Sequence, residues 1–111
     1  MLIFYKYLDE SIRARLFKKQ SDETISIKAD FTNAIESGEE ISEENSTITI
    51  YDSSDNDVTS IIKSGNLIFL NPAITIKVQG GEDGEKYKIS FKAKTTNHIY
   101  ELDIYMLIND I

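Results

Sequence analysis

The sequence predicts an all-β fold: an immunoglobulin/fibronectin-III-like antiparallel β-sandwich of about seven strands, preceded by an N-terminal arm. Three observations predict it. Apolar and polar residues alternate over several short segments, and turn residues interrupt these segments at intervals of about 8–12 residues. The glycine-rich segment 80–84 leads into a strand that begins with Tyr87. A tyrosine after a loop that crosses between sheets is typical of the penultimate strand of such a sandwich.

The 111 residues divide into two parts. Residues 1–20 form an N-terminal arm, and residues 21–111 form the sandwich domain. Within the arm, Ile12, Leu16 and Phe17 have the spacing of a short helix, but the same segment also alternates as in an edge strand. The sequence leaves both alternatives open.

Alternation places the strands of the sandwich domain in order. The predicted strands are residues 25–29, 47–51, 58–62, 67–70, 74–78, 87–93 and 100–106. The turns between them are predicted at 36–40, 52–57, 64–66, 80–84 and 96–98, with a further break at Pro72. The segment 58–62 is the least regular of the strands. One apolar face on each strand predicts a single core between two sheets.

Charge and composition exclude several classes of function. Nineteen acidic residues against twelve basic ones give a net charge of −7, which repels a phosphate backbone, so no nucleic-acid partner is expected. The even spacing of Lys86, Lys88, Lys92 and Lys94 is typical of a solvated strand face. No apolar run approaches the roughly 20 residues of a membrane-spanning helix, so no membrane partner is expected. The absence of cysteine excludes disulfides and thiolate metal sites.

No residue set predicts catalysis, a cofactor or a metal. His98, the single histidine, falls in a predicted hairpin turn, where nothing in the sequence places the carboxylate and serine of a catalytic triad. Asp52, Asp55 and Asp57 fall in one loop, but they lack the spacing of an EF-hand and are explained by turn chemistry. The glutamates within residues 39–44 are expected to form a solvated loop.

Gly80, Gly81, Gly84 and Tyr87 form a predicted structural corner. Glycine adopts the positive φ angles that a tight change of direction requires. A phosphate-binding loop is excluded because the segment leads into a strand instead of a helix and carries two acids.

Phe4, Tyr5 and Tyr7 form a candidate interaction arm outside the sandwich pattern. They belong either to an added edge strand or to an apolar arm that docks on a neighbour by strand addition. Tyr105 and Leu107 fall on the outward face of the last strand, where they either cover the arm or form a partner patch. Cover within the molecule is favoured, because it avoids aggregation.

Several segments of the chain together resemble a known family. They are residues 19–24, 29–31, 34–41 and 80–89. Small phage and prophage proteins share a basic lead-in with Pro/Ser, Asp and Glu, an Asp-Trp or Asp-Phe step, a turn of the form Leu-x-x-Gly-Asp-x-Ile, and a corner of the form Gly-Gly-x-x-Gly-x-x-Tyr-x-Val. The similarity runs from about Lys18 to Ile104. This chain departs from the pattern with Phe31 where Trp is common and Gln20-Ser21 where proline is common.

The resemblance implies a function without catalysis. The members of that family are similar to immunoglobulin-like or fibronectin-like sandwiches and are described as tail-associated structural or fibre–tail adaptor proteins. The expectation is a structural adaptor of a phage or prophage particle, at the tail, connector or fibre attachment. Its expected partners are other virion or tail proteins and copies of itself, and its expected location is the virion, assembled in the host bacterial cytoplasm.

A surface module that binds a ligand or carbohydrate is the alternative function. Sugar sites favour exposed aromatic rings, and Tyr5, Tyr7, Tyr100 and Tyr105 are the tyrosines that would supply them.

Overall fold

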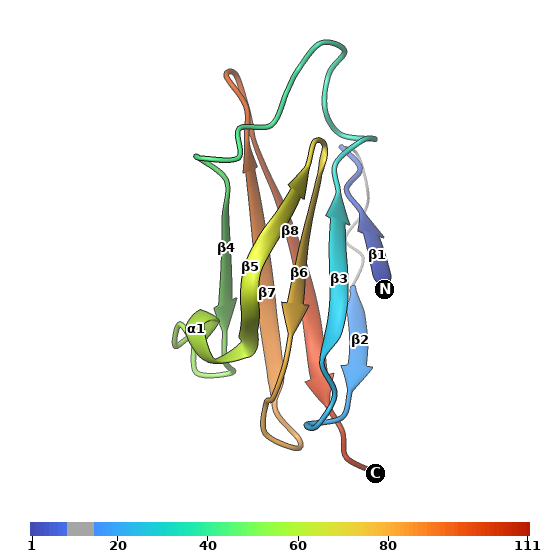
Figure 1. Cartoon of the computed structure of the whole chain (residues 1–111), viewed down its shortest axis with the longest axis vertical. Coiled ribbons are helices and arrows are strands. Elements are labelled where there is room, and N and C mark those ends of the chain that lie inside the picture. The colour runs from blue at the N-terminus through green and yellow to red at the C-terminus, as the bar shows by residue number, and fades with distance from the viewer. Residues whose placement is uncertain (9–14) are drawn as a thin grey trace.

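A computed structural model describes residues 1–8 and 15–111 of the chain as two four-stranded sheets stacked face to face (Figure 1). The first sheet has the order β1-β3-β6-β5 and the second has the order β2-β8-β7-β4. The strands are β1 Leu2–Tyr5, β2 Leu16–Lys19, β3 Ile25–Asp30, β4 Thr47–Tyr51, β5 Lys63–Leu70, β6 Ala73–Val78, β7 Lys86–Lys94 and β8 Ile99–Ile108. The prediction of an all-β fold is confirmed.

The strand count and the strand directions differ from the prediction. The described residues form eight strands instead of about seven, because residues 1–20 supply both β1 and β2 while the segment predicted as a strand at 58–62 forms none. The sheets are not wholly antiparallel, since β1 runs parallel to β3 and β2 runs parallel to β8. Segment 16–19 is extended, so the helical alternative is wrong there, whereas Ile12 lies outside the described residues. Four-residue strands carry no sequence signal for the direction of their partner.

The segment predicted as an irregular strand at 58–62 is a single helical turn, α1 (Thr59–Ile62). The Asp57 carboxylate accepts the Thr59 N–H at 3.0 Å, and the N–H groups of Ile61 and Ile62 both donate to the carbonyl of Val58. This turn buries Ile62 and leaves Ile61 exposed. Local side-chain bonding to the backbone therefore overrides the β-branched composition.

The turn predicted at 64–66 is also different, because it lies inside β5. The pairing of β5 with β6 shifts between Ser64 and Ile68, and Gly65 has a φ of 74°. A positive φ within a strand is typical of a β-bulge, for which glycine has no steric cost. The break therefore bends the edge strand instead of ending it.

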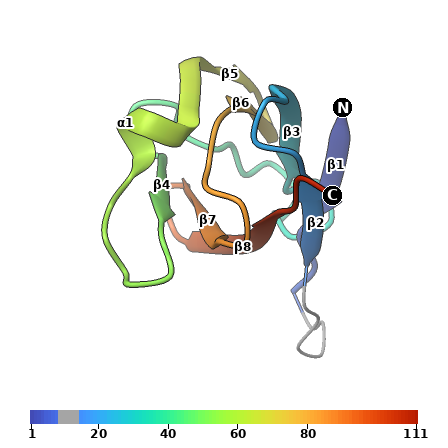
Figure 2. The same ribbon diagram turned by 90° about the horizontal axis from the view of Figure 1, so that it is seen from below.

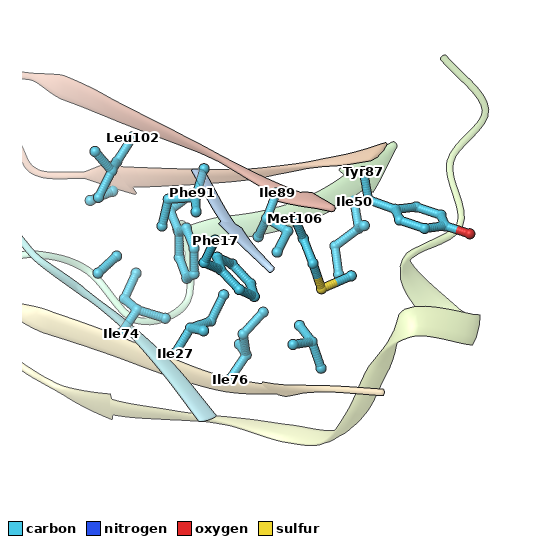
Figure 3. Packing of buried hydrophobic residues seen from close by; sticks show 14 of the residues in the cluster. Phe17, Ile27, Ile50, Ile74, Ile76, Tyr87, Ile89, Phe91, Leu102 and Met106 are labelled. Atoms are coloured by element: carbon cyan, nitrogen blue, oxygen red, sulfur yellow. The ribbon is translucent and has the colours of Figure 1, made fainter. Parts of the chain in front are cut away.

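The core lies between the two sheets and receives side chains from both (Figure 3). Ile27, Ile74 and Ile76 project from the first sheet toward Phe91 and Met106 of the second, and all five are almost completely buried. Full burial of one such side chain stabilises the fold by about 1.5–3 kcal/mol. The alternation of apolar and polar residues along these strands is visible in the sequence, so the core could be predicted from it.

Figure 2 shows how the two sides of the sandwich are closed. On one side α1 lies between β4 and β5, the last strands of the two sheets. On the other side lie β1 and β2, which are offset from each other along the long axis of the molecule in Figure 1, and both chain termini are near them in Figure 2. The N-terminal segment therefore supplies the edge strand of both sheets on a single side of the molecule.

Candidate functional site

The strongest candidate for a functional surface is the side formed by β1 and β2. We call it the N-terminal edge and define it as residues 1–8 together with Leu16. β1 pairs with β3 in the register Leu2↔Ile27 to Tyr5↔Asp30, and the Lys6 N–H extends this pairing to the Asp30 carbonyl at 2.9 Å. β1 is the last strand of its sheet, so one row of its backbone N–H and C=O groups faces away from the sheet.

The N-terminal edge is apolar although it is exposed. Its exposed large apolar side chains are Met1, Leu2, Ile3, Tyr5, Tyr7, Leu8 and Leu16. The fractions accessible to solvent include 75% for Met1, 46% for Ile3 and 67% for Leu8. Exposed apolar side chains gathered on and beside one edge strand make this side a candidate site for a partner.

The structure separates the three predicted arm residues. Phe4 points inward and packs against the core, with its ring centroid 6.0 Å from that of Phe17. Tyr5 is 43% exposed and Tyr7 is 47% exposed. Phe4 thus anchors β1 to the fold, while the two tyrosines remain available at the surface.

The last strand is flanked by β2. Leu16 pairs with Tyr105 and Lys18 pairs with Leu107, and the outward-facing side chains of Tyr105 and Leu107 are half-buried. The Tyr105 N–H also donates to the Arg15 carbonyl at 2.7 Å. This pairing gives β8 an edge partner on its outer side.

The three glycines of the predicted corner lie in the connection from β6, in the first sheet, to β7, in the second, and Tyr87 is the second residue of β7. The Tyr87 hydroxyl accepts the N–H of Glu82, five residues upstream, at 3.1 Å. Gly80, Gly81 and Gly84 have φ angles of 62°, 96° and 87°. At Gly81 a Cβ would lie 2.7 Å from Ile108, so this position requires glycine for its space as well as for its φ.

Lys19 links this corner to the segment 20–23, a contact that no sequence pattern indicates. Lys19 is only 2% exposed, whereas the neighbouring Lys18 is exposed. Its Nζ donates to the carbonyls of Gln20 at 2.7 Å, Glu23 at 2.8 Å and Gly80 at 2.7 Å. Burial lowers the pKa of Lys19, and the carboxylate of Glu23 opposes this effect.

Two of the segments that carry the family resemblance therefore meet in space. The basic lead-in 19–24 and the glycine corner are 61 residues apart in sequence at their bonded groups, Lys19 and Gly80. An ammonium group surrounded by backbone carbonyls fixes both segments at one end of the sandwich. This contact gives a physical reason for a basic residue at the start of the lead-in.

Glu39 was expected in a solvated loop, but its side chain is only 8% exposed. It accepts hydrogen bonds from the hydroxyls of Thr95 and Tyr100, and His98 Nδ1 lies 2.8 Å from Oε2. These bonds, that of Thr95 foremost, lower the pKa of Glu39 to about 2. The bond to Glu39 raises the pKa of His98, and burial followed by the bond to Glu39 raises the pKa of Tyr100 to about 12.

This Glu39 cluster holds the 36–40 turn against the β7–β8 hairpin. The sequence could not place the carboxylate beside His98, because the two residues are 59 positions apart. A catalytic triad would also require a nucleophile near the other ring nitrogen. Among the described residues, His98 Nε2 lies 3.9 Å from Glu36, which is another acid. The geometry favours a structural clamp.

In the 52–57 loop, Asp52 accepts hydrogen bonds from backbone N–H groups of the same loop. Asp52 Oδ1 accepts the N–H groups of Ser54 and Asn56, each at 2.9 Å, and Asp55 has a φ of 63°. Hydrogen bonds from Asn56 lower the pKa of Asp52. In residues 1–8 and 15–111, no group of three or more His, Cys, Asp or Glu side chains is arranged to hold a metal.

The tyrosines of the alternative carbohydrate site do not share one exposed face. Tyr100 is 7% exposed and its hydroxyl is bonded to Glu39. The Tyr105 ring lies under the Lys86 ammonium, 5.2 Å from the ring centroid, and Tyr51 has the same contact with Lys88. The lysine row is thus partly packed on aromatic rings.

Over the described part of the chain, no helix is long and apolar enough to span a membrane.

Comparison with known proteins identifies a family for this chain. No curated protein and no solved structure matches the chain. A family model described as podophage GP4 fiber-tail adaptor protein gp77 matches residues 19–106. The match begins at the buried lysine of β2, includes the glycine corner and Tyr87, and ends in β8. It covers most of the chain, which therefore belongs to the podophage GP4 fiber-tail adaptor (gp77) family.

Proposed function

We propose that this chain is a non-enzymatic structural adaptor of a phage or prophage particle, attached to other tail proteins through its N-terminal edge. The family supports a role in joining fibre to tail. The observation that carries the proposal is the concentration of exposed apolar side chains on and beside an edge strand. An unpaired strand edge accepts a further strand by backbone hydrogen bonding, and neighbouring apolar side chains add specificity.

The rest of the molecule supports a passive role. The net charge of −7 disfavours a nucleic-acid partner, and Glu39 and Asp52, whose pKa values are lowered, serve to fix loops and turns. The chain assembles into the virion in the host cytoplasm, where the absence of cysteine suits a reducing compartment.

We also propose that the sandwich is immunoglobulin-like. The order β3-β6-β5 against β8-β7-β4 corresponds to strands B-E-D against G-F-C, and Tyr87 occupies the place of the corner tyrosine. β1 lies beside β3, where an A strand would lie. A crystal structure in which the β6–β7 connection stayed within one sheet would contradict this assignment.

Incorporation into particles tests the adaptor role. Ile3→Lys places a charge on the N-terminal edge, and Ile68→Lys is the matched control on β5, at the opposite edge of the same sheet. The two isoleucines are similarly exposed, at 46% and 56%. Tagged versions of the chain are produced in cells that assemble the particle, and the tag is measured in purified particles by immunoblot.

We expect Ile3→Lys to be lost from particles, whereas Ile68→Lys is retained at the level of the unaltered chain. Circular dichroism of both purified variants verifies that each remains folded. Equal retention of the two variants would exclude the N-terminal edge as the attachment surface.

A further inference from the structure

We propose that β1 is exchanged between copies of this chain, so that β1 of one protomer pairs with β3 of a second. This inference rests on the proposed function in that it names a partner for the same edge, a second copy of the chain. Exchange of an identical element is a low-cost route to an oligomer, because β1 makes the same hydrogen bonds and packing on a neighbouring copy as on its own chain.

The acceptor for β1 is already defined by this chain. It consists of the edge of β3 and the Phe17 ring, against which Phe4 packs. A second copy offers the same edge in the same register, Leu2↔Ile27 to Tyr5↔Asp30. Every copy of this chain carries this acceptor, whereas an unrelated partner need not carry one.

The interaction of β1 with its own sandwich is limited. Its pairing involves four residues, and Phe4 is the only one of them that is not exposed. Leu2, Ile3 and Tyr5 are 39–46% exposed in the single chain. Exchange keeps the pairing of β1 and holds a second copy close to these side chains, whose burial against that copy would add to the stability of the oligomer.

The connection between β1 and β2 is long enough for exchange. Residues 7–14 separate the last backbone bond of the arm, from Lys6 to Asp30, from Arg15. Eight extended residues span up to about 26–29 Å. That span exceeds the roughly 10 Å between the two sheets of a sandwich.

Charge favours an approach between copies. Residues 1–20 contain five Lys/Arg and two Asp/Glu, a formal charge of +3, while residues 21–111 contain seven and seventeen, a formal charge of −10. Opposite charges of this size attract the arm of one copy to the body of another and raise the rate of encounter. A chain of uniform acidity would repel its copies instead.

Two single-cysteine variants test the exchange, since the chain has no cysteine of its own. Ile3 and Lys28 are register partners across β1 and β3, where neighbouring strands are about 4.8 Å apart. An untagged Ile3→Cys chain and a tagged Lys28→Cys chain are unfolded, mixed, refolded at high concentration and oxidised. A disulfide between the two chains forms at this pair only when the arm of one lies on β3 of the other.

The matched control mixes the same Ile3→Cys chain with tagged Thr75→Cys. Thr75 pairs with Lys28 on the next strand, so it lies about 9.6 Å from the arm, beyond the span of a disulfide. We expect several-fold more mixed dimer on a non-reducing gel with Lys28→Cys than with Thr75→Cys. Equal amounts of mixed dimer in the two mixtures would overturn the proposal.

The two proposals fail separately. Mixed dimers without incorporation of the chain into particles would overturn the adaptor role and leave the exchange intact. Incorporation that depends on Ile3, together with no excess of mixed dimer, would overturn the exchange and leave the adaptor role intact.

Discussion

Replacement of Lys19 by methionine is the most direct test of how the lead-in and the corner are held together. Lys19→Met keeps most of the buried aliphatic stem and removes the ammonium group. The three short bonds from Nζ, to the carbonyls of Gln20, Glu23 and Gly80 at 2.7–2.8 Å, are then lost, together with a longer one to Ser21 at 3.5 Å. The Gln20 carbonyl still accepts the Glu23 N–H. The effect falls on the free energy of unfolding, since these bonds hold the two segments together at one end of the sandwich.

The magnitude follows from these three bonds. A hydrogen bond to a charged group contributes about 1.5–3 kcal/mol net, so their gross loss is about 4.5–9 kcal/mol. Removing the cation also removes its desolvation cost, which is the reason that burial lowers the pKa of Lys19. We expect a net loss of about 2–5 kcal/mol, a large part of the roughly 5–15 kcal/mol typical of a domain. The Tm should fall by at least about 8 °C.

Lys18→Met is the matched control, because Lys18 is the adjacent residue of β2 and its side chain is exposed. A surface substitution of this kind changes stability by about 0.5 kcal/mol or less. Urea unfolding followed by tyrosine fluorescence, with thermal melts by circular dichroism, gives both values for each variant. If Lys19→Met were within about 1 kcal/mol of Lys18→Met, the bonds at Nζ would carry less than the net contribution assigned to them.

Two further predictions use matched pairs. Gly81→Ala should destabilise the fold by about 1–3 kcal/mol more than Gly84→Ala, as measured by urea unfolding. Both glycines have a positive φ, but only a Cβ at Gly81 meets Ile108. An equal cost of the two substitutions would refute the close approach at Gly81. The pKa of Glu39 is lowered in the folded chain, so the contribution of Glu39 to folding stability is present above pH 4.5 and is lost as the pH falls toward 2. The pKa of His98 is raised, so the contribution of His98 is present below pH 6.5 and is lost as the pH rises through its folded pKa. The stability difference between the unaltered chain and Glu39→Gln should therefore be largest between about pH 4.5 and 6.5, whereas Glu40→Gln should show no such maximum.

The strands of the core could be predicted because their signal is local. The alternation in 47–51, 74–78 and 87–93 shows which side chains face inward, and burial of those side chains is what stabilises the sheets. The glycine corner before Tyr87 was readable for the same reason, since φ preference is a property of a single residue.

Local patterns failed where side chains bond the backbone or where strands are short. At 58–62 the composition predicted a strand, but Asp57 and Val58 supply the hydrogen bonds of a helical turn. At the N-terminus a four-residue strand shows neither its partner nor its direction, so the parallel pairing of β1 with β3 came only from the fold.

The sequence by itself determined an all-β chain with one core, an acidic net charge and the motifs of a phage adaptor family, because alternation, turn residues and composition are encoded residue by residue. The tertiary structure alone decided which distant groups meet. It placed Lys19 on the Gly80 carbonyl, Glu39 beside His98, and the apolar arm on the edge of β3. Such interactions join residues 25 to 61 positions apart, and no pattern within either segment encodes its partner.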